Sequence, residues 1–199
     1  MAYRDFTLIK IKEQFGITRQ YINLFPNDTP EIIPSNHLLE SVEIAYKMPL
    51  RNEKSRSEYL VSPILTEIKL RNQDKMQLFS GENLKADPKA GLNGEVDFLV
   101  VNVPDADEIA SPIINVMEAK RGDIEPSVAQ CVAQMIGART FNQKHQDNTE
   151  TIHGVVTTGT EWLFLKLEGQ TIFQDLNRYG TNDLPKLLGR LQLIINFYQ

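Results

Sequence analysis

The sequence predicts a single mixed α/β domain, and three observations support this prediction. The chain has 199 residues, 41% of them hydrophobic and 24% charged, which is enough for one well-cored domain and short for two. Short runs rich in Val and Ile, typical of buried strands, lie at 94–101, 113–120 and 152–158. Apolar residues at helical spacing lie before, between and after these runs. A mixed sheet with helices on both faces is the simplest packing for this order.

Residues 1–50 are interpreted as a cap that packs on the core. Residues 1–25 mix apolar and charged positions, and those between 6 and 11 fit no single period, so helix and strand both stay open over 1–25. A proline followed by Asn and Asp at 26–28 marks a clear break. Ser35 or Asn36 then caps a helix that carries apolar residues at 38, 39, 42, 44 and 45.

The core is expected over residues 53–160, and its first element is a helix at about 55–70. Apolar residues form a partial helical stripe along this segment. Pro63 interrupts the stripe, and it either kinks the helix or starts a second segment capped by Ser62.

Three strands follow this helix along the chain. The first ends at Ser80-Gly81, a turn-rich stretch leads to the second, and a solvated connection over 102–112 leads to the third. The strands are expected at 76–79, 94–101 and 113–120.

A turn at 121–123 and a helix over about 126–142, with a proline at its first position, come next. Further strands are expected at 152–158, 162–167 and 171–176, the first two joined by a hairpin turn. Residues 161–199 thus add strands to the core and a final helix capped by Asn182 or Asp183.

Two of the apolar strands carry charged residues, which are rare in a buried strand unless they have a structural or functional role. Because side chains alternate across a strand, Glu118 and Lys120 are expected on one face with Ile114 and Val116. If this strand pairs with the one that contains Asp97, two carboxylates and an ammonium converge at one point of the sheet. Burying such charges costs several kcal/mol unless they pair with each other or hold a metal.

This arrangement resembles the PD-(D/E)xK nuclease superfamily, which has the restriction-endonuclease-like fold. Its members keep an Asp on the second core strand and a Glu-x-Lys or Asp-x-Lys triplet on the third. Asp97 and the triplet at 118–120 supply these residues here. Gln130 and Gln134 lie on the next helix, where some members carry Gln. The resemblance covers residues 53–160 and includes the order αβββαβ.

Residues 57–65 are also similar to the first helix of small uncharacterised bacterial members, which begins Ser-Glu-x-x-x-x-Pro-Ile-Leu. This similarity favours Glu58 over Glu67 as the first-helix carboxylate. The two are nine residues apart, so an unbroken helix would turn them to opposed faces.

The resemblance implies a nuclease that hydrolyses phosphodiester bonds of nucleic acid. Asp97, Glu118 and Glu58 would hold Mg²⁺ or Mn²⁺, since such ions take hard oxygen ligands. Lys120 would assist the attacking water. Gln130 would contact the substrate phosphate or position Lys120. DNA or RNA, endo- or exonucleolytic cleavage, and a homodimer or partner protein all stay open.

Composition narrows the classes of function. The net charge of −5 argues against strong non-specific nucleic-acid binding and favours a weakly binding, partner-guided nuclease. The single cysteine, Cys131, excludes an internal disulfide and a cysteine-based zinc site. No apolar run approaches the roughly 20 residues of a membrane span, and a cytoplasmic protein is expected.

Two alternatives remain from the sequence. One is a catalytically inactive nucleic-acid-binding or protein-interaction module on the same fold. The other is a homo-oligomer that associates through the apolar C-terminal helix.

Overall fold

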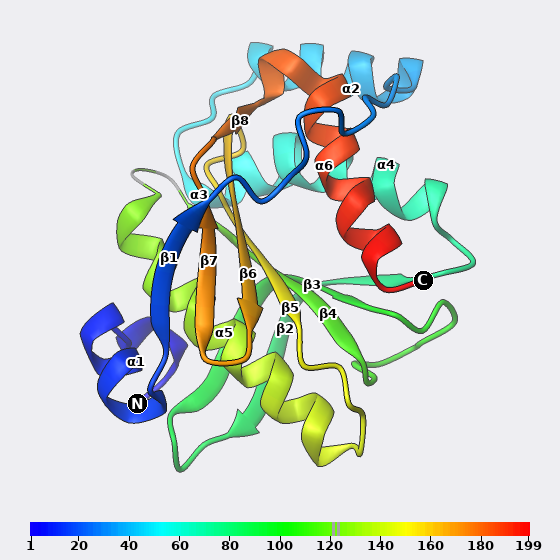
Figure 1. Cartoon of the computed structure of the whole chain (residues 1–199). Helices are drawn as coiled ribbons and strands as arrows, with labels where there is room; N and C mark the ends of the chain where they lie inside the picture. The colour runs from blue at the N-terminus through cyan, green and yellow to red at the C-terminus, as the bar shows by residue number, and fades with distance from the viewer. Residues whose placement is uncertain (121, 123) are drawn as a thin grey trace.

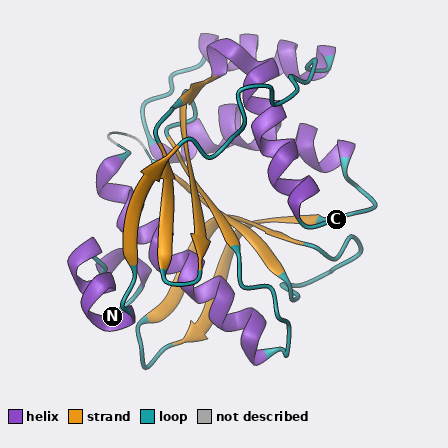
Figure 2. Cartoon of the chain, viewed as in Figure 1, coloured by secondary structure: helices purple, strands orange, loops and turns teal. Residues whose placement is uncertain are grey.

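A computed structural model, which describes residues 1–120, 122 and 124–199, shows one mixed β-sheet with helices on both faces (Figure 1, Figure 2). The strands are β1 (Thr18–Ile22), β2 (Gln77–Asp87), β3 (Leu92–Val101), β4 (Ile113–Ala119), β5 (Ile152–Thr157), β6 (Glu161–Glu168), β7 (Thr171–Asp175) and β8 (Tyr179–Gly180). The α-helices are α1 (Leu8–Phe15), α2 (Asn36–Lys47), α3 (Glu53–Arg56), α4 (Ser62–Arg71), α5 (Glu125–Lys144) and α6 (Leu184–Phe197). The turn expected at 121–123 includes residues outside this description.

Within the described residues the sheet has eight strands in the order β1-β7-β6-β5-β4-β3-β2, and β8 pairs with β6. The strands β2, β3 and β4 form an antiparallel meander, and α5 crosses over to place β5 parallel to β4. The strands β6 and β7 continue antiparallel, and β1 closes the edge parallel to β7. The predicted mixed α/β class and the order αβββαβ are confirmed, with α3–α4 as the first helix.

The core lies in two layers, one on each face of the sheet. Val96, Leu99 and Val116 pack with α5 and α1 on one face. Phe98 and Met117 pack with α2, α4 and α6 on the other face, as the positions of the helices in Figure 1 show. Both faces of β3 and β4 are therefore covered, which explains why these strands read as nearly continuous apolar runs.

The first core helix is a continuous helical segment with a wider turn inside it. A π-helical turn over Ser57–Val61 joins α3 to α4, and the amide of Ser62 donates to the carbonyl of Ser57. Pro63 lies in the first turn of α4. Because proline has no amide hydrogen and clashes with the preceding turn, the wider turn accommodates it without ending the helix.

Two expectations about the strands are wrong in detail. Ser80-Gly81 does not end β2, because Gly81 takes a φ of 70° and pairing with β3 resumes at Glu82. Ile114 does not share a face with Val116, because the pairing register shifts at this end of β4. Ile114 packs with the α4 and α6 layer, whereas Val116 packs against α5.

The N-terminal segment contains both elements that the sequence left open. The helix α1 packs against α5, and β1 extends the sheet by one strand. The hydroxyl of Ser35 accepts a hydrogen bond from the amide of Leu38 and caps α2, as expected. No helix in the described part of the chain is both long and apolar enough to cross a membrane.

Candidate active site

Pairing of β3 with β4 brings Asp97 and Glu118 to the same end of the sheet. The ladder pairs Phe98 with Met117, so Asp97 and Glu118 follow directly beyond the last pair. Beyond this pair a side chain, and not the backbone, links the two strands. The Oδ2 of Asp97 accepts a hydrogen bond from the amide of Ala119 at 2.7 Å. This contact fixes the carboxylate of one strand against the backbone of the other.

Glu118 is almost fully buried, with 1% of its surface exposed. Its Oε1 lies against the ammonium of Lys120 and accepts a hydrogen bond from the Gln130 amide. Its Oε2 accepts a hydrogen bond from Gln134 Nε2 at 2.6 Å. Gln130 and Gln134 reach the same carboxylate because they lie one turn apart on the face of α5 that covers β4.

Burial and mutual charge shift the ionisation of this group. Burial, and then the charge of Asp97, raise the pKa of Glu118 from 4.5 to about 7, against the opposing effect of Lys120. Burial also raises the pKa of Asp97, although the Ala119 amide opposes this. Burial alone would lower the pKa of Lys120, but the Glu118 carboxylate outweighs burial and raises it. Lys120 therefore keeps its proton at neutral pH, whereas Glu118 exchanges its proton there.

Lys120 also contacts a carboxylate that sequence reasoning missed. Its backbone amide donates to the carbonyl of Thr157 at 2.7 Å, which holds the residue at the end of β4. Its ammonium lies 3.5 Å from the carboxylate of Glu53, the first residue of α3. Asn52 caps α3 by accepting a hydrogen bond from Ser55, and so places Glu53 toward the sheet. This N-cap pattern is the one signal in the sequence that marks Glu53 as an ordered position.

The two first-helix carboxylates considered from the sequence lie elsewhere. Glu58 has 54% of its side chain exposed and lies 3.8 Å from the ammonium of Lys54. Glu67 is buried away from Lys120 and accepts hydrogen bonds from Ser35 and Arg71. The structure thus brings together Asp97, Glu118, Lys120 and Gln130, and the carboxylate of the first helix that lies beside Lys120 is Glu53.

These side chains border a cavity of about 620 Å³, a size typical of ligand sites. One wall comes from the N-terminal segment, where Tyr3 and Arg4 lie, and another from Asn83 of β2. Tyr3 is buried, and its ring packs against Gly137 of α5. Nothing in the local sequence marks Arg4 as part of this cavity, because the contact joins segments far apart in the chain.

The donor set fits a magnesium-like ion. Asp97 and Glu118 offer hard carboxylate oxygens on a polar cavity, and each ionised carboxylate disfavours the other, which a cation between them would offset. No group of three or more His, Cys, Asp or Glu side chains in the described ranges is arranged to hold a metal. Two carboxylates completed by water and substrate oxygens are the usual protein share of a Mg²⁺ site.

Comparisons with known proteins inform the fold. No family model matches the sequence, and no curated protein matches it. Among solved structures, the chain is similar to a protein of the DrdV–DNA complex determined by cryo-electron microscopy, with a TM-score of 0.52 and 11% sequence identity over 83% of this chain. The chain covers 14% of the length of that protein. At this identity the likeness shows the fold alone, and the eight-stranded mixed sheet of the described residues is compatible with a restriction-endonuclease-like fold.

Proposed function

We propose that this chain hydrolyses phosphodiester bonds of nucleic acid with the help of Mg²⁺ or Mn²⁺. The observation that carries the proposal is the convergence of Asp97, Glu118 and Lys120 on one polar cavity at the ends of paired strands. The structurally similar protein was determined in a complex with DNA, which supports nucleic acid as the substrate class.

Each residue has a role that follows from its contacts. Asp97 and Glu118 would hold the ion, which when bound polarises the scissile phosphate and acidifies water. Gln130 and Gln134 fix the orientation of the Glu118 carboxylate. Lys120 carries a retained positive charge beside the place where negative charge develops on the phosphate, and so stabilises that charge.

We further propose Glu53 as the first-helix carboxylate of this site in place of Glu58. Glu53 and Glu118 both form ion pairs with the Lys120 ammonium, and Glu53 borders the same cavity. Its role is therefore to position Lys120, or to take a share in metal binding when Lys120 moves toward the substrate.

One observation favours a second candidate, an inactive binding module on the same fold. Both oxygens of Glu118 already accept hydrogen bonds or an ion pair from this chain's own side chains. A carboxylate whose oxygens are all bound by side chains of its own chain can have a purely structural role, as part of a buried charge network that holds no metal. The net charge of −5 also suits a protein that relies on a partner for nucleic-acid binding.

A cleavage assay separates the two candidates. Plasmid, single-stranded DNA and RNA are incubated with Mg²⁺ or Mn²⁺ and the wild type, Asp97→Asn or Lys120→Met proteins. Glu43→Gln, which removes an exposed carboxylate of α2, serves as the matched control. We expect Mg²⁺-dependent cleavage by the wild type and the control, and losses of about 100-fold or more in the two site variants.

The same assay compares Glu53→Gln with Glu58→Gln, and we expect the larger loss for Glu53→Gln. Cleavage that survives in Asp97→Asn and Lys120→Met would place the activity elsewhere. Absence of cleavage, together with no metal-dependent change in melting temperature, would favour the inactive module.

A further inference from the structure

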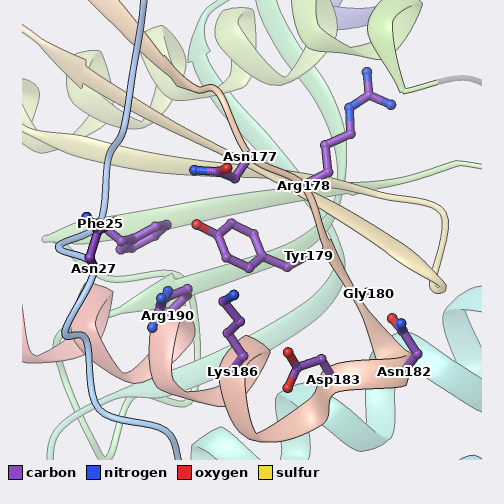
Figure 3. Close-up of a pocket in the computed structure, with 10 residues that line it drawn as sticks. All are labelled: Phe25, Asn27, Asn177, Arg178, Tyr179, Gly180, Asn182, Asp183, Lys186 and Arg190. Atoms are coloured by element: carbon purple, nitrogen blue, oxygen red, sulfur yellow. The ribbon is translucent and has the colours of Figure 1, made fainter.

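A second polar cavity, of about 310 Å³, lies beside β8 and the start of α6. Figure 3 shows the residues that line it, and none of them borders the cavity of Asp97 and Glu118. Among the described residues, three cations line this second cavity, namely Arg178, Lys186 and Arg190, against a single acid, Asp183. The cavity is therefore rich in positive charge although the chain as a whole is acidic.

Two of these cations occupy the same face of one helix. Lys186 and Arg190 are four residues apart on α6, and Figure 3 shows both side chains pointing toward the ring of Tyr179. Like charges at this spacing repel each other and destabilise a helix. An anion between them would remove that cost.

Arg190 is buried, and no carboxylate of the described chain pairs with it. Only 5% of its surface is exposed, and its guanidinium donates to the carbonyl of Thr29 at 3.0 Å and lies over the rings of Phe25 and Tyr179. Its Nε is buried and has no hydrogen-bond partner among the residues that the structure describes. The guanidinium also donates to the Tyr179 hydroxyl, and that hydroxyl donates to the buried Asp175 carboxylate at 3.1 Å, so a carboxylate compensates Arg190 only through this tyrosine.

The other two cations differ in how far they are neutralised. Arg178 already pairs with Glu161 at 3.2 Å and with Glu125 at 3.7 Å. Across the ranges 1–120, 122 and 124–199, no carboxylate lies within ion-pair distance of Lys186. A half-buried Lys186 and a buried Arg190, neither of them in an ion pair, leave positive charge in this cavity, and an anion in the cavity would offset the cost of that charge.

We propose that this cavity binds a phosphate group. A phosphate has enough acceptor oxygens to use the Lys186 ammonium, the Arg190 guanidinium and the side-chain amides of Asn27 and Asn182 together. A carboxylate offers only two oxygens to the same donors. The N-terminal end of α6, with its positive partial charge, lies at the same cavity and adds to the attraction.

The phosphate has two sources with the same chemistry, namely a nucleic-acid strand or a free phosphate or nucleotide. The proposal does not depend on cleavage at Asp97 and Glu118, since the two cavities share none of the described lining residues. Asp97→Asn therefore keeps phosphate binding even if it abolishes cleavage, and failure of one proposal is distinguishable from failure of the other.

The test measures binding of inorganic phosphate by calorimetry, with sodium chloride at matched ionic strength as the blank. Lys186→Gln removes one charge from a half-buried position, and Lys89→Gln removes one from the exposed β2–β3 turn as the matched control. We expect the wild type and Lys89→Gln to bind, and Lys186→Gln to bind about 10-fold more weakly or not at all. Arg190→Gln is expected to show the same loss, and Lys186→Gln carries the test if Arg190→Gln does not fold.

A second titration uses an oligonucleotide with a 5′-phosphate and the same strand with a 5′-hydroxyl. Competition of either strand with inorganic phosphate identifies nucleic acid as the source, and binding of inorganic phosphate alone identifies the free anion. Equal binding of phosphate by the wild type, Lys89→Gln and Lys186→Gln, or no binding by the wild type, would overturn the proposal.

Discussion

Replacement of Glu118 by glutamine tests whether the buried carboxylate is held at a cost to stability. Glu118→Gln keeps the shape of the side chain and removes its charge. Gln134 now donates its Nε2 to Glu118 Oε2, and its Oε1 is buried and has no partner in the described structure, so a flip of the Gln134 amide presents an acceptor to the new Nε2 group. We expect the variant to fold with the same packing around β4 and α5.

The sign and size of the effect follow from the pKa of Glu118. Its ordinary pKa is 4.5, and the folded chain raises it to about 7. The folded state thus holds the proton of Glu118 more tightly than the unfolded state, so the contribution of this group to stability is greatest below pH 4.5 and falls as the pH rises through 7. The full difference is about 3 kcal/mol of unfolding free energy once both states are ionised.

The assay is urea unfolding of both proteins over this pH range in the presence of a chelator. We expect equal stability at acidic pH and a Gln variant that is about 3 kcal/mol more stable above pH 7. Addition of Mg²⁺ above pH 7 should stabilise the wild type and leave the variant unchanged, because metal binding to the folded state offsets the ionised carboxylates. Glu43→Gln is the control for loss of an exposed charge.

A stability difference that does not change with pH would refute this reasoning. It would mean that Lys120, Gln130 and Gln134 compensate the ionised carboxylate fully. A Gln variant that is less stable than the wild type above pH 7 would also refute it, because Glu118 would then be a stabilising partner of Lys120.

Three further predictions concern other parts of the fold. Burial lowers the pKa of His153 to about 3, so the free energy of unfolding should fall as the pH decreases below 6.5. In urea titrations over this pH range, His153→Gln should make that fall shallower by about 1.4 kcal/mol per pH unit. Gly189→Ala should lower the melting temperature although alanine favours helices, because the added Cβ would lie 2.1 Å from the backbone oxygen of Pro30; an unchanged or higher melting temperature would contradict this. Cys131 is fully buried and its pKa is raised by burial, so a thiol reagent should modify it only as fast as the chain unfolds, and rapid modification of the native protein would show the packing to be wrong.

The central strands and their charges were predictable because their signals are local. The run over Ile113–Ala119 is buried at every position, and a carboxylate inside such a run has few explanations. The helical spacing of Gln130 and Gln134 likewise placed both on one face, and both donate to Glu118. Asp97 was identified because it interrupts the apolar end of β3, which is buried from Phe98 to Val101.

Other features were not predictable because they depend on contacts between distant segments. Glu53 lies in a charged, polar stretch with no clear period, and only the return of α3 to the end of β4 brings it to Lys120. The N-terminal wall of the cavity depends on contacts such as that between Asn93 and the carbonyl of Met1, 92 residues apart. Gly81 looks like a strand end in the sequence, because the partner strand that continues the pairing lies beyond it.

The most direct test of the central claim is metal binding itself. Titration of Mn²⁺, followed by its electron paramagnetic resonance signal, counts bound ions in the wild type, Asp97→Asn and Glu43→Gln. We expect saturable binding by the wild type and Glu43→Gln, loss of that binding in Asp97→Asn, and competition by Mg²⁺. Equal Mn²⁺ binding by Asp97→Asn, or cleavage by a wild type that binds no Mn²⁺, would contradict the assignment of Asp97 and Glu118 as the metal-holding pair.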